Sequence, residues 1–191
     1  MENNEHVTLR PAEPGDAEFI AWGLATALGA SMSDFATSRE LSDMIRLDDV
    51  FYSWRHATIA LWDGAYAGVS IAYDGGIYPE MRQKTFRMLG KLTGYDYDGQ
   101  DDEAYADELY IDTLAVLPSM RRRGIGRALL EGAINAARKS GFARATLAVH
   151  PENLKAQALY KSLGFQQERT VFIFGEDYWR MVHPFRDEEV S

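Results

Sequence analysis

Cysteine is absent from the 191-residue sequence. Its absence excludes disulfides, thiolate metal sites and a cysteine nucleophile. Long apolar runs are also missing, because no stretch approaches the roughly 20 apolar residues that span a bilayer, and we expect no membrane partner. Residues 1–6 are acidic and polar, with no basic or apolar segment, so they predict no secretory signal and a cytoplasmic location.

Positive charge is scarce, with 20 Lys and Arg against 29 Asp and Glu and a net charge of -9. A chain this acidic is a poor ligand for nucleic acid, and we expect no such partner. The histidines show no metal-ligand spacing, so no metal site is predicted. They are His6, His56, His150 and His183.

The charges are unevenly distributed along the chain. Residues 92–120 contain eight acidic residues and no Lys or Arg, whereas residues 121–161 contain nine basic residues and two acidic ones. Two interpretations are open. The segments could form two solvated surfaces of opposite sign, or one site that holds an anion on one side and a cation on the other.

Hydrophobic periodicity and turn residues predict a mixed α/β fold with a partly antiparallel sheet. Strands are expected at 7–10, 58–62, 66–73, 109–117, 145–149, 166–174 and 178–183. Helices are expected between Asp16 and Gly29, from Ser38 to Leu47, from Pro79 to Leu92, and at 124–140 and 153–163. The sequence thus predicts a single domain, 1–191, with an insertion at about 74–107 that forms a helix and then an irregular loop.

The strongest local signal is a tight turn that leads from the strand at 109–117 into a helix. It reads Arg121-Arg122-Arg123-Gly124-Ile125-Gly126-Arg127. Free N–H groups and the helix dipole favour an anion at a helix start, and glycine lets the anion approach the backbone. The Walker and dinucleotide-binding patterns do not fit, because the Walker lysine and a third glycine are missing. We expect a phosphate-binding turn; the alternative is a glycine-capped turn beside a solvated basic face.

Two segments resemble the motifs of a known family. Leu114-Ala115-Val116-x-Pro118-x-x-Arg121-x-x-Gly124-x-Gly126-x-x-Leu129-Leu130 resembles motif A of the GNAT acetyltransferase superfamily, and Asn153-x-x-Ala156-x-x-Leu159-Tyr160-x-x-x-Gly164-Phe165 resembles its motif B. The resemblance implies the GNAT fold, a mostly antiparallel sheet of about seven strands that is splayed where acetyl-coenzyme A binds. It also implies an N-acetyltransferase with an amine-bearing acceptor.

The same resemblance assigns residues to the bound acetyl-coenzyme A. The backbone of Leu114, Ala115 and Val116 would pair with the pantetheine arm, and the amides of the phosphate-binding turn would hold the pyrophosphate. Motif B would bring three further residues to the cofactor, namely Asn153, Ala156 and Tyr160.

Tyr160 is the candidate acid for the departing thiolate. A phenol with a reference pKa near 10 keeps its proton at neutral pH and can donate it to a thiolate whose reference pKa is near 8.5. The alternative is a core tyrosine on the helix face beside Leu159.

Glu108 and Asp112 are the candidate bases for the amine. In a regular strand they share one face with Tyr110 between them. Family members often place a glutamate base on this strand, but the most usual slot, four residues before Leu114, holds Tyr110. Either acid could instead serve as a solvated strand residue. His150 is a turn residue or a proton relay.

The acceptor is predicted from the loop at residues 95–107, where tyrosines alternate with acids. Carboxylates concentrate cations and aromatic faces bind ammonium groups, so a cationic amine is one hypothesis and a solvated acidic loop is the other. Alternatives to the enzyme are an acyl-coenzyme A sensor without catalysis, a transferase for another acyl group and a nucleotide-binding domain. Monomer and homodimer both remain open.

Overall fold

The computed structural model describes residues 6–29 and 39–185 of the chain. Seven strands form one sheet in the order β1-β2-β3-β4-β5-β7-β6. The strands are β1 Val7–Pro11, β2 Ala57–Trp62, β3 Ala65–Asp74, β4 Glu108–Val116, β5 Arg144–Val149, β6 Gln166–Ile173 and β7 Glu176–Pro184. Every neighbouring pair is antiparallel except β4 and β5, which are parallel. The mixed, mostly antiparallel sheet expected from the sequence is confirmed.

Five α-helices accompany the sheet in the described part of the chain. They are α1 Ala17–Ala27, α2 Arg39–Ile45, α3 Tyr78–Thr93, α4 Ile125–Lys139 and α5 Leu154–Ser162. The expected start of the second helix at Ser38 lies outside the described residues. No helix among the described residues is long and apolar enough to cross a membrane.

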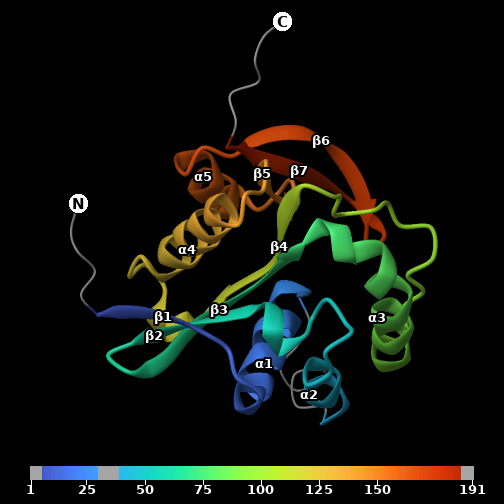
Figure 1. The fold of residues 1–191 in the computed structure, drawn as a ribbon, viewed down its shortest axis with the longest axis horizontal. Helices are drawn as coiled ribbons and strands as arrows, with labels where there is room; N and C mark the ends of the chain where they lie inside the picture. Colours follow the sequence, from blue (N-terminus) through green and yellow to red (C-terminus); the bar gives the residue numbers. More distant parts are fainter. Residues whose placement is uncertain (1–5, 30–38, 186–191) are drawn as a thin grey trace, which may run out of the picture.

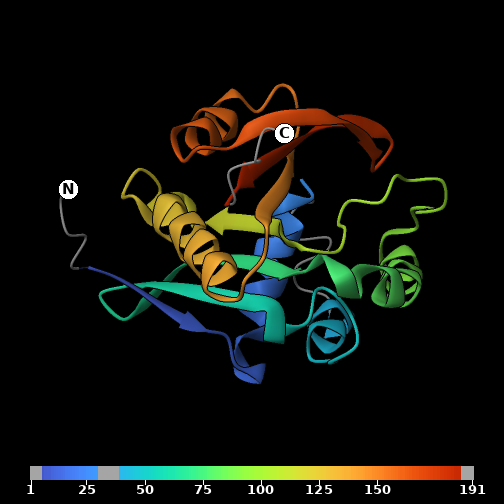
Figure 2. The same ribbon diagram turned by 45° about the horizontal axis from the view of Figure 1, so that its top comes forward.

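The helices cover both faces of the sheet (Figures 1 and 2). Successive side chains of β3 point to opposite faces of the sheet, so each face can be covered by its own helices. Val69, Ile71 and Tyr73 pack with α1, while Ala72 packs on the side of α4. Helix α1 approaches its face closely at Gly23, where an added Cβ would lie 2.2 Å from Val69 Cγ1. A small residue is therefore required at that contact.

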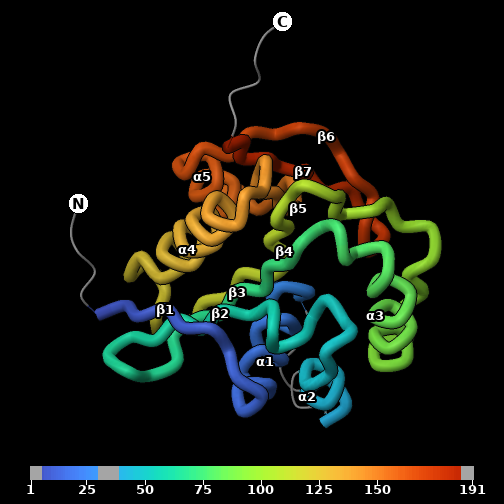
Figure 3. The backbone as a smooth tube through the Cα atoms, viewed as in Figure 1, coloured from blue at the N-terminus to red at the C-terminus, as the bar shows by residue number. Residues whose placement is uncertain are grey.

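Residues 74–107 contain the expected helix, α3, followed by a loop without regular structure at 94–107. This loop returns to β4 past the β6–β7 hairpin (Figure 3). The amide of Asp101 donates to the Phe172 carbonyl at 2.9 Å, and the Phe172 amide donates to the Asp101 carboxylate at 2.8 Å. These two hydrogen bonds attach the loop to the edge strand β6. The loop therefore lies along one side of the central part of the sheet.

Candidate functional site

Strands β4 and β5 run together for only four residue pairs. Their pairing begins at Glu108 with Arg144 and ends at Ile111 with Leu147. Asp112 is an extra residue on β4, since Ile71 of β3 pairs with Thr113 and Ala72 pairs with Ile111. Such a bulge bends a strand and re-aims a side chain. The splay expected from the family resemblance is present, and Asp112 stands at the point where the strands part.

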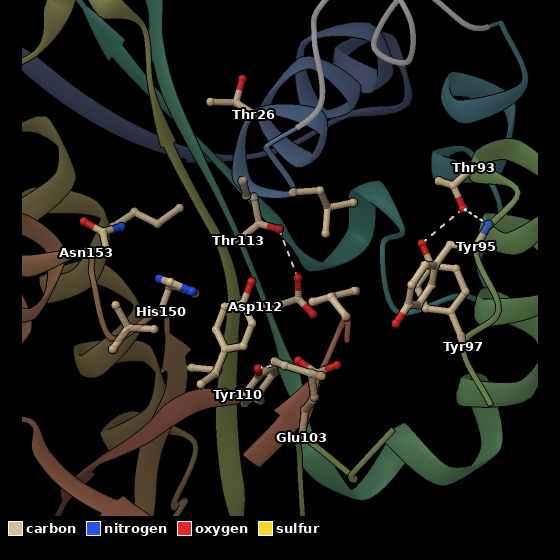
Figure 4. Close-up of a pocket in the computed structure, with 18 of the residues that line it drawn as sticks. Thr26, Thr93, Tyr95, Tyr97, Glu103, Tyr110, Asp112, Thr113, His150 and Asn153 are labelled. Atoms are coloured by element: carbon tan, nitrogen blue, oxygen red, sulfur yellow. Dashed lines mark hydrogen bonds between the residues drawn. The ribbon is translucent and has the colours of Figure 1, made fainter. Parts of the chain in front are cut away.

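A cavity of about 480 Å³ lies where the strands diverge. Its wall is formed by the end of α1, the loop after α3, β4, the end of β5, the start of α5 and the β6–β7 hairpin. Residues lining it include Thr26, Thr93, Tyr95, Tyr97, Glu103, Tyr110, Asp112, Thr113, Leu114, His150, Asn153, Tyr160, Phe174 and Tyr178. Figure 4 shows Asn153 and His150 on one side of the cavity and Asp112, Glu103, Tyr95 and Tyr97 on the other.

The phosphate-binding turn leads into α4 as expected. Gly124 precedes the helix with φ +78°, and Arg122 also adopts a left-handed conformation with φ +63°. Helix α4 begins at Ile125, so the amides of its first turn have no intrahelical acceptor. The turn therefore presents a row of backbone donors and the positive end of a helix dipole.

The arginine side chains of this turn have contacts of their own. Arg121 Nε donates to the Val116 carbonyl at 3.3 Å, and Arg127 Nη2 donates to Ser162 Oγ at 2.7 Å. The Arg123 guanidinium lies 5.0 Å from the Trp62 ring centroid. Anion binding at this turn would thus depend first on the backbone.

Asn153 and Tyr160 both line the cavity, whereas Ala156 does not. Asn153 caps α5, because its Oδ1 accepts from the Ala156 amide at 3.2 Å. On β4, Leu114 lines the cavity while the side chain of Ala115 packs on the α1 side. The three motif B residues thus have different surroundings, and the contact recorded for Ala156 is its backbone bond to the cap of α5.

Tyr160 is 9% exposed and packs beside Phe165. Burial raises the pKa of its hydroxyl to about 12. The phenol therefore keeps its proton across the neutral range and can act as a donor into the cavity.

Glu103 and Asp112 form a pair of acids in the same cavity. Tyr110 Oη donates to Glu103 Oε2 at 2.7 Å, and Tyr73 Oη donates to Asp112 Oδ2 at 3.1 Å. Burial and the Asp112 charge raise the pKa of Glu103. Burial also raises the pKa of Asp112, against the opposing hydrogen bonds from Thr113 and Tyr73. A carboxylate with a raised pKa is a better proton acceptor near neutral pH than a free one.

Glu108, the other acid expected to serve as a base, is not brought to the cavity. Its carboxylate is 1% exposed and forms an ion pair with Arg180, whose side chain is 2% exposed. Its Oε1 also accepts from the Tyr105 amide at 2.9 Å. Because these donors occupy the carboxylate, Glu108 is poorly placed to take a proton from a molecule in the cavity.

Sequence reasoning missed Glu103 as an individual residue. In the sequence it is one of three consecutive acids, and nothing there separates it from Asp101 and Asp102. In the structure, Asp101 binds the β6 backbone and Asp102 is exposed, whereas Glu103 is 4% exposed. The loop at 95–107 does line the cavity, through Tyr95, Tyr97 and Glu103.

His150 directly follows β5 and lines the cavity. Its Nδ1 accepts from the Glu152 amide at 3.2 Å, and its Nε2 lies 3.3 Å from Glu176 Oε2. The ring is therefore tied into the turn that leads to α5, as expected of a turn residue.

Comparisons with known proteins agree with this geometry. Residues 32–165 match the acetyltransferase (GNAT) family. The [ribosomal protein bS18]-alanine N-acetyltransferase of Escherichia coli (strain K12) is 46% identical over 61 residues, which are 32% of this chain and 41% of that protein. The match thus spans less than half of that relative.

Solved structures share the fold. A crystal structure of an acetyltransferase has a TM-score of 0.74 at 23% identity, covering 94% of this chain and 100% of the other. An acetyltransferase from Salmonella typhimurium, solved with its cofactor acetyl-CoA, has a TM-score of 0.62 at 18% identity, covering 97% of each chain.

Proposed function

Because the chain belongs to the GNAT acetyltransferase family, we propose that it transfers an acetyl group from acetyl-coenzyme A directly to an amine. The observation that carries this proposal is the cavity at the parted strands. It has Asn153 and Tyr160 at one end and the acids Glu103 and Asp112 at the other. A thioester and an amine could meet there between a proton donor and a proton acceptor.

The donor substrate would occupy the splayed strands. Beyond Ile111 the edge of β4 that faces β5 is free of strand pairing, so the backbone of residues 114–116 can bond the amides of the pantetheine arm. The amides that begin α4 would hold the pyrophosphate. The Salmonella typhimurium structure with acetyl-CoA supports this choice of donor.

The proposed reaction moves protons at both ends of the cavity. The ammonium group of the acceptor gives a proton to the Glu103–Asp112 pair, directly or through water, and the neutral nitrogen then attacks the thioester carbon and releases its second proton to water. The carbon–sulfur bond breaks, and the departing sulfur receives a proton from Tyr160, which regains one from water. Glu103 and Asp112 thus take the role of base in this proposal, and Glu108 does not.

Tyr160→Phe tests the proton donor. We expect kcat to fall about 100-fold, because general acid catalysis commonly contributes that much or more, while thermal stability stays close to that of the native protein. The assay follows thiol release from acetyl-coenzyme A over a panel of amines. Tyr95→Phe, which alters another tyrosine of the cavity wall, is the matched control. An unchanged kcat in Tyr160→Phe would remove this residue from the mechanism.

The same assay separates the alternatives. Binding of acetyl-coenzyme A without turnover on any amine would favour an acyl-coenzyme A sensor. Competition by ATP would favour a nucleotide-binding domain, and faster turnover with a longer acyl chain would indicate a different donor.

Gly126→Ala tests the pyrophosphate site. A Cβ at this position would lie 3.7 Å from Val116 Cγ2 and 3.8 Å from Leu159 Cδ2, which are ordinary contacts. The variant should therefore fold with unchanged or slightly higher stability, because alanine favours a helix. Losing the close approach of an anion should cost about 1.5–3 kcal/mol, or roughly ten- to hundredfold in acetyl-coenzyme A affinity.

Titration calorimetry with acetyl-coenzyme A measures the effect of Gly126→Ala. Gly15→Ala is the control, because a Cβ there would meet nothing within 4 Å. Unaltered affinity in Gly126→Ala would show that this glycine does not contact the cofactor.

A further inference from the structure

The carboxyl groups in the cavity wall have no lysine or arginine of the described residues beside them there, and the histidine of the wall, His150, has its Nε2 3.3 Å from Glu176 Oε2. Glu103 and Asp112 line it, and no Lys or Arg does so among the described residues. The sequence of residues 30–38, which lie outside the described part, also contains neither. A ligand that carried its own carboxylate would therefore enter without a Lys or Arg partner and would face the shared negative charge of the Glu103–Asp112 pair.

Arg180 and Arg82, two arginines close to Glu103, are held by other groups and do not line the cavity. Arg180 is paired with Glu108 and Glu168. Arg82 Nη2 donates to the Gln100 carbonyl at 3.0 Å on the α3 side of the loop. Because each has a partner, neither is free to turn toward an anionic substrate.

Four of the eight hydroxyl groups that the described residues bring to the cavity wall are also occupied as donors within the protein. Thr26 donates to the Trp22 carbonyl at 2.8 Å, Thr93 to the Leu89 carbonyl at 2.9 Å, and Thr113 to Asp112 at 3.0 Å. The hydroxyl proton of Tyr110 goes to Glu103. These groups cannot take the place of a missing cation by donating to a carboxylate.

The rest of the acceptor wall is aromatic. Tyr97 packs edge-on against Phe174, with centroids 6.0 Å apart, and Phe174 meets Tyr178 at 6.3 Å. Tyr95 stands against Tyr97 with centroids 4.9 Å apart. Aromatic walls accept a flat apolar body and the face of an ammonium group.

We propose that the acceptor is a small primary amine with an aromatic body and no carboxylate beside the nitrogen. This inference rests on the proposed function. The ammonium group would be held by the acids at the β4 bulge, and the body of the molecule would lie against Tyr97, Phe174 and Tyr178. Free α-amino acids would be rejected, because their carboxylate would be desolvated beside Glu103 and Asp112 without a partner.

Matched acceptors test the proposal by changing one group at a time. 2-Phenylethylamine, phenylalaninamide and phenylalanine share the same ring and differ in what stands beside the amine: hydrogen, a neutral amide or a carboxylate. Rates are compared per unit of unprotonated amine. We expect the first two to be acetylated and phenylalanine to show a kcat/KM at least about 100-fold lower, as expected for a like charge placed near a buried acid.

A variant that adds a positive charge to the cavity wall tests the proposal independently of the acceptor series. Thr26→Lys would add a cation to the half-buried cavity wall, away from the groups that move protons. It should raise the kcat/KM of phenylalanine relative to phenylalaninamide, and Thr26→Gln should not. Equal use of phenylalanine and its amide by the native protein would overturn the proposal. So would a clear preference for spermidine, or for a peptide beginning with phenylalanine, over 2-phenylethylamine. If no amine at all is acetylated, the failure lies with the proposed function.

Discussion

Replacing Glu103 by glutamine is expected to lower kcat/KM for the amine about 100-fold, as befits the loss of a general base. The substitution keeps the size of the side chain and an acceptor for the Tyr110 hydroxyl, so the fold should persist. Only the ability to take a proton is removed.

The pH profile should change together with the rate. Burial and the neighbouring Asp112 raise the pKa of Glu103, so the native enzyme should gain activity as the pH rises through a range well above that of a free carboxyl. The sign follows because the base works in its deprotonated form. In Glu103→Gln the remaining fall of activity in acid should belong to Asp112 alone. It should lie at lower pH, because hydrogen bonds from Thr113 and Tyr73 oppose the effect of burial and the pKa of Asp112 is raised less than that of Glu103.

Two control variants sharpen this test. Asp98→Asn removes an exposed acid from the same loop and should leave both the rate and the profile unchanged. Glu108→Gln removes the buried acid that is paired with Arg180. If Glu103→Gln retains native activity and Glu108→Gln loses the acid limb, the base is Glu108, and our assignment is wrong.

Arg180→Met is expected to destabilise the protein by about 3–5 kcal/mol, the range for removing one partner of a buried ion pair. Arg180 bonds both Glu108 and Glu168, and its guanidinium lies 5.2 Å from the Tyr105 ring centroid. The variant leaves Glu108 buried beside a thioether. Urea unfolding at pH 7.5 measures the loss.

The loss of folding stability in Arg180→Met should be smaller in acid than at pH 7.5. Without its partner, the buried Glu108 carboxylate is an uncompensated charge in the folded state, and acid relieves the penalty by removing that charge. A deficit that grows as the pH falls would contradict the assignment of Glu108 as the orphaned charge.

A double variant isolates the pair. Arg180→Met with Glu108→Leu removes both charges and should recover much of the stability lost in the single variant. Arg144→Met is the contrasting control, because this side chain is 42% exposed and lies 3.8 Å from Glu108. Because the Arg144 side chain is partly exposed and makes only this longer contact with the buried Glu108, we expect its loss to cost about 1 kcal/mol or less. Equal losses in Arg144→Met and Arg180→Met would show that burial does not govern the effect.

The Arg180 pair also connects stability with the site. Arg180 Nε lies 3.5 Å from the Glu103 carbonyl, and Glu108 accepts from the Tyr105 amide. The buried ion pair thus fixes the backbone on either side of Ala104. It thereby also fixes the backbone position from which the Glu103 side chain extends. We expect Arg180→Met to lower kcat as well as stability.

Local patterns in the sequence were sufficient to place the strands and helices and the glycine turn before α4. Periodicity placed the seven strands, and glycines marked helix ends such as Gly29 and Gly141, both of which have positive φ. The turn before α4 could be read directly, because a helix start and its glycines are neighbours in the chain.

The pairing of Glu103 with Asp112 could not be predicted from local sequence patterns. Glu103 and Asp112 are nine positions apart, and one lies in an irregular loop whose course depends on hydrogen bonds to β6, a strand about 70 residues later. The bulge that directs Asp112 into the cavity depends on pairing with β3. The choice between Glu108 and Glu103 depends on Arg180, which comes from β7.

The sequence by itself therefore determined the family, the strands and helices, and the glycine turn before α4, because each is encoded by residues close together in the chain. Only the tertiary structure decided which acids enter the cavity and which are neutralised outside it. Burial and a counter-charge determine whether a carboxylate can accept a proton, and both come from segments that are distant in sequence.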